Sequence, residues 1–269
     1  MTGIRRRIVR SAVLLAVVAL LYLLFVVLPI GQRVDDLGAG LPAWLDAVTG
    51  IAVLLRTPLL VLSLAGAAVV IVDALTHRRV VPALTGVAVI GVAGLVNSFL
   101  RDVALSRPDL GSEAGFDGNS FPSGHAAVSV AAASVMIALW RWPRPRGMIA
   151  GIAAVPALVA LSSVLAHAHR VSDVIAGALL GGAISQWIAG TSVPSMPRVA
   201  RWLWTCVAII ASLSIGGTLA VVDTALDAMA PPLFTVGVVG VVASATALVM
   251  LVAPQPSPDV SASVLPSER

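Results

Sequence analysis

Two short stretches of the sequence contain residues suited to nucleophilic and acid–base chemistry. In the first, Ser123 and Gly124 precede His125, and in the second, His169 stands four residues before Asp173. Histidine can act as an acid, a base or a nucleophile near neutral pH. On a helix, His169 and Asp173 share one face, so the carboxylate can accept the proton of one ring nitrogen and leave the other free to attack. The pattern predicts catalytic roles for His169, His125 and Asp173.

A phosphate group is the ligand that best fits the residues around these histidines. Pro122 opens a predicted helix with Ser123 and Gly124 at its N-terminus, where backbone N–H groups and the helix dipole attract an anion. Gly124 lets a tetrahedral anion approach the backbone closely. Arg107 can offer two parallel hydrogen bonds to phosphate oxygens. We therefore predict that Arg107, Ser123 and Gly124 bind a phosphate group.

The elements that position these residues are predicted to be membrane-spanning helices. Of the 269 residues, 58% are hydrophobic and 11% are charged, an excess that fits a surface facing lipid. A bilayer core requires about 20 apolar residues per helix. The first of the predicted helices is interpreted as a retained span, because no small-residue cleavage site follows it. The apolar runs are 11–30, 54–74, 81–100, 124–140, 148–167, 171–190, 203–222 and 233–252.

The distribution of arginine predicts how these helices are oriented. All 17 basic residues are arginine, and most fall in cytoplasmic segments if the N-terminus lies in the cytoplasm. Both termini are then cytoplasmic, including the segment 1–10 and a disordered, Pro- and Ser-rich tail over 253–269. The loop 101–122 and the start of the sixth helix lie outside. The use of arginine alone indicates a bacterial genome of high GC content, so we expect the bacterial plasma membrane.

The chemical residues resemble the motifs of the type 2 phosphatidic acid phosphatase superfamily, which includes lipid phosphate phosphatases and vanadium haloperoxidases. Its motifs are Lys-x6-Arg-Pro, Pro-Ser-Gly-His and Ser-Arg-x5-His-x3-Asp. The second is complete over residues 122–125, the third keeps His169 and Asp173, and the first keeps Arg107 and Pro108. The resemblance therefore includes every residue predicted above to act in catalysis.

The resemblance covers residues 81–190 and is compatible with an all-α, polytopic transmembrane bundle. We expect a six-helix phosphatase core over 11–190. The two apolar runs within 203–252 are interpreted as additional transmembrane helices.

The resemblance implies a phosphohistidine mechanism without a metal ion or another cofactor. His169 would attack phosphorus, and Asp173 would orient its ring. His125 would protonate the leaving oxygen and later help water hydrolyse the intermediate. The phosphoryl oxygens would be held by Arg107, Ser123 and Gly124.

Two cationic ligands of the family are absent from their expected positions. Leu100 stands where the Lys of the first motif would be, and Ser163 stands where the Arg of the third would be. Losing one electrostatic donor can cost about 100- to 1000-fold in rate. Other arginines are therefore candidates to bind the substrate phosphate in their place: Arg56, Arg101 and Arg170.

The sequence as a whole predicts an integral membrane enzyme that hydrolyses a polyprenyl or glycerolipid phosphate or diphosphate at the outer face. Its expected partners are this substrate and membrane lipids; the net charge of +4 does not suggest nucleic acid, and the oligomeric state is open. One alternative is a catalytically weak relative that binds or transports a phospholipid headgroup, which the two missing cations favour. Another is a lipid phosphotransferase, which the same site would serve. A haloperoxidase is disfavoured because that role suits soluble chains with richer cationic ligation.

Overall fold

The computed structural model describes residues 3–39, 46–110, 118–141 and 146–188, and all regular structure within them is helical. The α-helices are α1 (Gly3–Tyr22), α2 (Pro29–Ala39), α3 (Asp46–Thr76), α4 (Val80–Phe99), α5 (Gly124–Leu139), α6 (Arg146–Leu165) and α7 (Val171–Ser185). Short π-helical segments extend α1 and α4, namely η1 (Leu23–Val27) and η3 (Leu100–Ala104). The predicted all-α class is confirmed for this part of the chain.

Six of the eight predicted apolar runs correspond to helices α1 and α3–α7. Among the described residues, three helical spans are long and apolar enough to cross a membrane: Ile4–Val27, Thr49–Thr76 and Val80–Ala104. Three shorter apolar helices accompany them, at Gly124–Leu139, Gly151–Leu165 and Val171–Ser185. The runs 203–222 and 233–252 and the tail 253–269 lie outside the described residues, so the two additional helices and the domain limits stay predictions.

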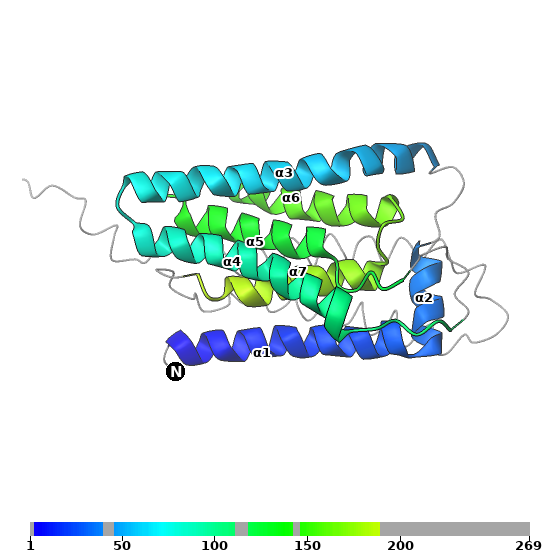
Figure 1. Ribbon diagram of the computed structural model, residues 1–269. Coiled ribbons are helices and arrows are strands. Elements are labelled where there is room, and N and C mark those ends of the chain that lie inside the picture. The colour runs from blue at the N-terminus through cyan, green and yellow to red at the C-terminus, as the bar shows by residue number, and fades with distance from the viewer. Residues whose placement is uncertain (1–2, 40–45, 111–117, 142–145, 189–269) are drawn as a thin grey trace, which may run out of the picture.

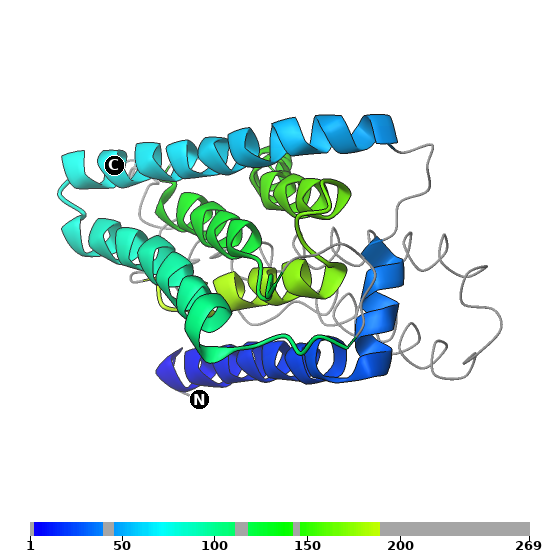
Figure 2. The ribbon, with the colours of Figure 1, turned by 45° about the vertical axis from the view of Figure 1, so that its right-hand side comes forward.

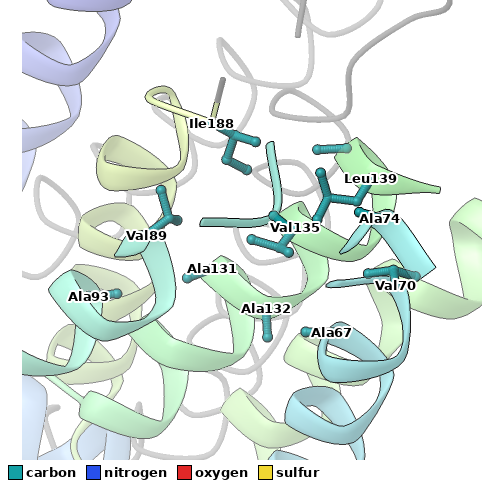
Figure 3. Packing of buried hydrophobic residues seen from close by; sticks show 12 residues of the cluster. Ala67, Val70, Ala74, Val89, Ala93, Ala131, Ala132, Val135, Leu139 and Ile188 are labelled. Atoms are coloured by element: carbon teal, nitrogen blue, oxygen red, sulfur yellow. The ribbon is translucent and has the colours of Figure 1, made fainter. Parts of the chain in front are cut away.

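Helix α5 occupies the centre of the bundle and packs against α3, α4, α6 and α7 (Figure 1). Most of its residues are small and fully buried, which lets neighbouring helices approach closely. On one side, Ala131, Ala132 and Val135 of α5 meet side chains of α3 and α4, as Figure 3 shows. Large apolar side chains on the outer surfaces of α1, α3 and α4 are exposed, for example Leu54 and Leu95. This distribution suits helices that face lipid.

Helix α2 was not predicted, and it runs across one end of the bundle while the other helices run along its length (Figures 1 and 2). Its sequence is too polar and too short for a membrane span. Gln32 and Asp35 are nevertheless buried, because they turn toward the bundle. The same end of the bundle contains the start of α5 and the start of α7, as well as residues 105–110. The residues predicted from the motifs to act in catalysis therefore belong to segments that meet at this end of the bundle.

Candidate active site

His169 lies just before α7 and is 7% exposed. Its Nδ1 atom is 3.1 Å from the backbone carbonyl oxygen of Ser120 and 3.9 Å from Oδ2 of Asp173. A carbonyl oxygen can only accept a hydrogen bond, so Nδ1 carries the hydrogen in this arrangement. The lone pair of the ring is consequently on Nε2, which is the nitrogen available for nucleophilic attack.

Asp173 holds the centre of a buried hydrogen-bond network in the first turn of α7. Its Oδ1 atom accepts a hydrogen bond of 2.9 Å from Nη2 of Arg107, and its Oδ2 atom accepts hydrogen bonds from Oγ of Ser120 and the backbone N–H of Arg170. Both side chains of the Arg107–Asp173 ion pair are almost completely buried. Ser120 thus links Asp173 to His169, because its hydroxyl binds the carboxylate while its carbonyl accepts from the imidazole.

His125 stands in the first turn of α5, and its ring centroid is 6.5 Å from that of His169. The two motifs are tied together by the backbone, since the N–H of Ser123 donates to the carbonyl of Asp173 at 2.8 Å. Phe121 and Pro122 are joined by a cis peptide bond. The side chain of His125 is partly exposed, so it is accessible to a substrate that approaches His169. A phosphoryl group between the rings would have a nucleophile on one side and a proton donor on the other.

Several buried donors around these histidines have no hydrogen-bond partner among the described residues. They are Nε and Nη1 of Arg107, Nε of Arg56 and Oγ of Ser123. Buried polar atoms in folded proteins are almost always paired, and unpaired ones call for an explanation. An oxyanion is a chemically suitable partner for each of them, because phosphate oxygens accept hydrogen bonds from guanidinium and hydroxyl groups alike.

The three arginines predicted as additional phosphate ligands are placed differently. Arg56 and Arg101 are both close enough to His125 to act on it electrostatically. Arg101 also forms a bidentate ion pair with its exposed neighbour Asp102. Arg170 is 1% exposed, and its Nε atom pairs with Asp36 of α2. The structure therefore brings Arg56 and Arg101 toward His125, whereas the guanidinium of Arg170 is engaged with α2.

The two positions that lack the family's cations are on different helical segments. Leu100 begins the π-helical segment η3. Ser163 is fully buried in α6, and its hydroxyl donates to the carbonyl of Val159 at 2.8 Å. The Ser163 carbonyl accepts the N–H of His169 at 3.2 Å. Ser163 thus contributes to the turn that precedes the predicted nucleophile, through its backbone. His167 adopts a positive φ of 50° in this turn and is exposed.

Sequence reasoning missed Ser120 and the polar side chains of α2. Ser120 stands two residues before Pro122, the first residue of the Pro-Ser-Gly-His stretch, and belongs to no motif itself. Gln32, Asp35 and Asp36 each have a partner more than 70 residues away in the chain, namely Pro108, Ser172 and Arg170. The only available signal was the pair of adjacent aspartates just after an apolar run. Among the described residues, no group of three or more His, Cys, Asp or Glu side chains is arranged to hold a metal ion.

Part of the chain is similar to a known protein family. Residues 82–197 match the family model described as the PAP2 superfamily. No curated protein and no solved structure matches the chain. The matched stretch contains Arg107, Ser123, His125, His169 and Asp173, the residues that the structure gathers at one end of the bundle. The resemblance drawn from the motifs is thereby confirmed at the level of the family: residues 82–197 are similar to the PAP2 superfamily.

Proposed function

We propose that the protein hydrolyses a lipid phosphate or diphosphate at the outer face of the bacterial plasma membrane, through a phosphohistidine intermediate. The observation that carries this proposal is the relation of the two histidines: their ring centroids are 6.5 Å apart, and His169 Nδ1 is bound to the Ser120 carbonyl. Nε2 of His169 is then the nucleophile. His125 supplies and removes protons.

In the first step, Nε2 of His169 attacks phosphorus and a P–N bond forms as the P–O bond to the lipid breaks. The leaving oxygen takes the bonding electron pair and a proton from His125. The ring of His169 becomes positively charged, and the Asp173 carboxylate, 3.9 Å from Nδ1, stabilises this charge. The free donors of Arg107 and Ser123 hold the phosphoryl oxygens, where negative charge accumulates.

In the second step, water attacks phosphorus from the side that the lipid has left. His125, now neutral, accepts a proton from this water, the P–N bond breaks, and its electron pair returns to His169. Inorganic phosphate leaves, and both histidines recover their initial protonation. A lipid hydroxyl in place of water would make the same chemistry a phosphotransfer reaction.

A lipid substrate is supported by the setting of the site. The histidines lie at one end of a bundle whose outer helices present large apolar side chains such as Leu54 and Leu95. A polyprenyl or acyl chain can remain in the hydrocarbon region while its phosphate reaches the boundary of the membrane. The arginine distribution supports the outer face for this end of the bundle.

A second candidate, a catalytically weak protein that binds or transports a phospholipid headgroup, is favoured by one observation. Neither Leu100 nor Ser163 can offer the positive charge that the family's motifs provide there. Arg56 opposes this candidate, since its unpartnered Nε and its charge near His125 supply a cation from another helix.

The test is phosphate release by the purified protein from phosphatidate, diacylglycerol diphosphate, a polyprenyl phosphate and a polyprenyl diphosphate. We expect release from at least one of them, with His169→Ala inactive and His125→Ala strongly impaired. His167→Asn is the matched control, because His167 is an exposed histidine two residues from His169 and Asn tolerates its positive φ. Headgroup binding by the wild type without release of phosphate from any lipid would favour the second candidate. Full activity of His169→Ala would exclude the phosphohistidine mechanism.

A further inference from the structure

Helix α2 buries polar side chains at the end of the bundle where the active site lies. Gln32 is 3% exposed and Asp35 is 4% exposed, although both belong to a short helix outside the membrane-spanning helices. Burying an amide or a carboxyl group is unfavourable unless each is hydrogen-bonded. The partners of these groups therefore show what α2 is built to hold.

The carboxyl group of Asp35 binds the start of α7. Its Oδ1 atom accepts the backbone N–H of Ser172 at 3.1 Å, and its other oxygen pairs with the Ser172 hydroxyl. Ser172 is in the first turn of α7, whose N–H groups have no partner within the helix. Asp35 therefore caps α7 from a different helix. The neighbouring Asp36 pairs with Arg170. Helix α2 therefore binds Arg170 and Ser172, which both lie in the chain between His169 and Asp173.

The same helix also holds the segment that carries Arg107. Nε2 of Gln32 donates to the carbonyl of Pro108 at 3.0 Å and to that of Val26 at 2.6 Å. Pro108 follows Arg107 directly, and Arg107 pairs with Asp173. Helix α2 thus contacts the backbone next to the phosphate-binding arginine and the backbone next to the nucleophile, two segments more than 60 residues apart.

We propose that Asp35 is a positioning residue of the phosphatase site, which fixes the start of α7, and with it His169 and Asp173, against Arg107. This inference rests on the proposed function. Asp35 touches no reacting atom; it acts through Ser172. A shift of about 1 Å in the relative position of a nucleophile and an oxyanion ligand can cost about 100-fold in rate, so a cap of this kind has a direct effect on turnover.

The charge of Asp35 gives this positioning residue a pH dependence. Burial, and secondly the nearby Asp173 carboxylate, raise the pKa of Asp35 to about 7, against hydrogen bonds from Ser172 and the charge of Arg107. The charged groups that act on Asp35 are Asp173 of α7 and Arg107 of the segment between η3 and α5. The ion pair of Asp36 with Arg170 is adjacent. Above that pKa a second negative charge competes for Arg107, which must also hold the phosphate. Turnover should therefore decline as Asp35 ionises.

The experiment compares Asp35→Ala and Asp35→Asn with Arg33→Ala, an exposed residue of the same helix. Two measurements are made on each purified protein: kcat and KM against pH from 5 to 9, and binding of orthovanadate, a phosphate mimic, from its effect on Tm. We expect Asp35→Ala to lower kcat about 10- to 100-fold with KM within about 3-fold, and to weaken vanadate binding. Asp35→Asn, which keeps the acceptor oxygen for Ser172, should retain kcat within about 3-fold at pH 6 and lose the alkaline decline attributable to Asp35.

Two results would overturn the inference. One is an Asp35→Ala protein that matches Arg33→Ala in kcat and in vanadate binding. The other is an Asp35→Asn protein whose kcat falls at alkaline pH as much as that of the wild type. If Asp35→Ala does not fold, the result for Asp35→Asn decides. A wild type that hydrolyses no lipid phosphate contradicts the proposed function instead, and vanadate binding by the same variants then still tests the role of Asp35.

Discussion

The α-carbon of Gly177 in α7 lies so close to Ser123 that a methyl group on Gly177 would be 2.2 Å from the Ser123 carbonyl oxygen. One turn further, Gly181 approaches Ala127 in the same way, with a corresponding distance of 2.3 Å. No real side chain tolerates such a contact with the backbone, so α5 and α7 must separate if either glycine is replaced. This close approach sets the distance between His125 on α5 and His169 before α7.

Gly177→Ala should therefore impair both stability and turnover. We expect a loss of about 1–3 kcal/mol in stability, the usual cost of overpacking, and about 100-fold in kcat from displacement of the two histidines. Gly91→Ala is the control, because a methyl group at Gly91 meets nothing within 4 Å. Thermal unfolding in detergent and phosphate release measure the two effects. An unchanged Tm and kcat in Gly177→Ala would contradict the packing of α5 on α7.

Arg107→Lys should lower kcat/KM about 100- to 1000-fold. Arg107 uses Nη2 for Asp173 and keeps Nε and Nη1 buried and unpartnered. A lysine ammonium can replace the ion pair, but it cannot extend two further donors in a fixed plane to a phosphate. Arg33→Lys, on the exposed side of α2, serves as the control. If Arg107→Lys retained full activity, the unpartnered guanidinium donors would have no part in binding phosphate.

Arg56 and Ser163 can be tested together as alternative places for the missing positive charge. Because Arg56 lies near His125 with its Nε unpartnered, Arg56→Gln should lower kcat/KM about 100-fold. Ser163→Arg should also lower it, since Ser163 is fully buried and a long charged side chain there would overpack the helices around it. Phosphate release by the two variants and the double variant measures this. Higher activity in Ser163→Arg would indicate that the site lacks a cation.

The protonation of Asp35 should appear in the stability of the protein as well as in its activity. Its pKa is raised from 3.8 to about 7 in the folded protein, so the folded state binds this proton more tightly than the unfolded state. The resulting stabilisation is complete below about pH 4 and is lost as pH rises through about 7. Between these values, the Tm of Asp35→Asn should fall less with pH than that of the wild type. Parallel Tm–pH curves for the two proteins would show that Asp35 has an ordinary pKa.

The orientation in the membrane can be tested with single cysteines in a Cys206→Ser background. Leu110 is exposed three residues after Arg107, at the end of the bundle with the candidate active site, and His77 is exposed in the turn between α3 and α4 at the other end. In intact cells, Leu110→Cys should react with an impermeant thiol reagent, whereas His77→Cys should react only after lysis. The reverse pattern would place the active site in the cytoplasm.

The membrane helices could be predicted from the sequence because their signal is local: a run of about 20 apolar residues specifies a span by itself. The motif histidines could be placed at one end for the same reason, since counting spans fixes which ends meet. Helix α2 was missed because it is short and polar, and its buried face is defined by partners such as Ser172 in another part of the chain. The Arg170 side chain likewise points toward Asp36, and no local sequence pattern links these two residues.

The cap that α2 places on α7 has a consequence for how the protein is made. Asp35 and Ser172 are 137 residues apart, and a nascent chain emerges from the ribosome beginning with the N-terminal residue. Helices α1 to α6 must therefore be synthesised before the carboxyl group of Asp35 meets its partner. The contact that positions the start of α7 can therefore form only late in biosynthesis, after nearly all of the described residues have been made.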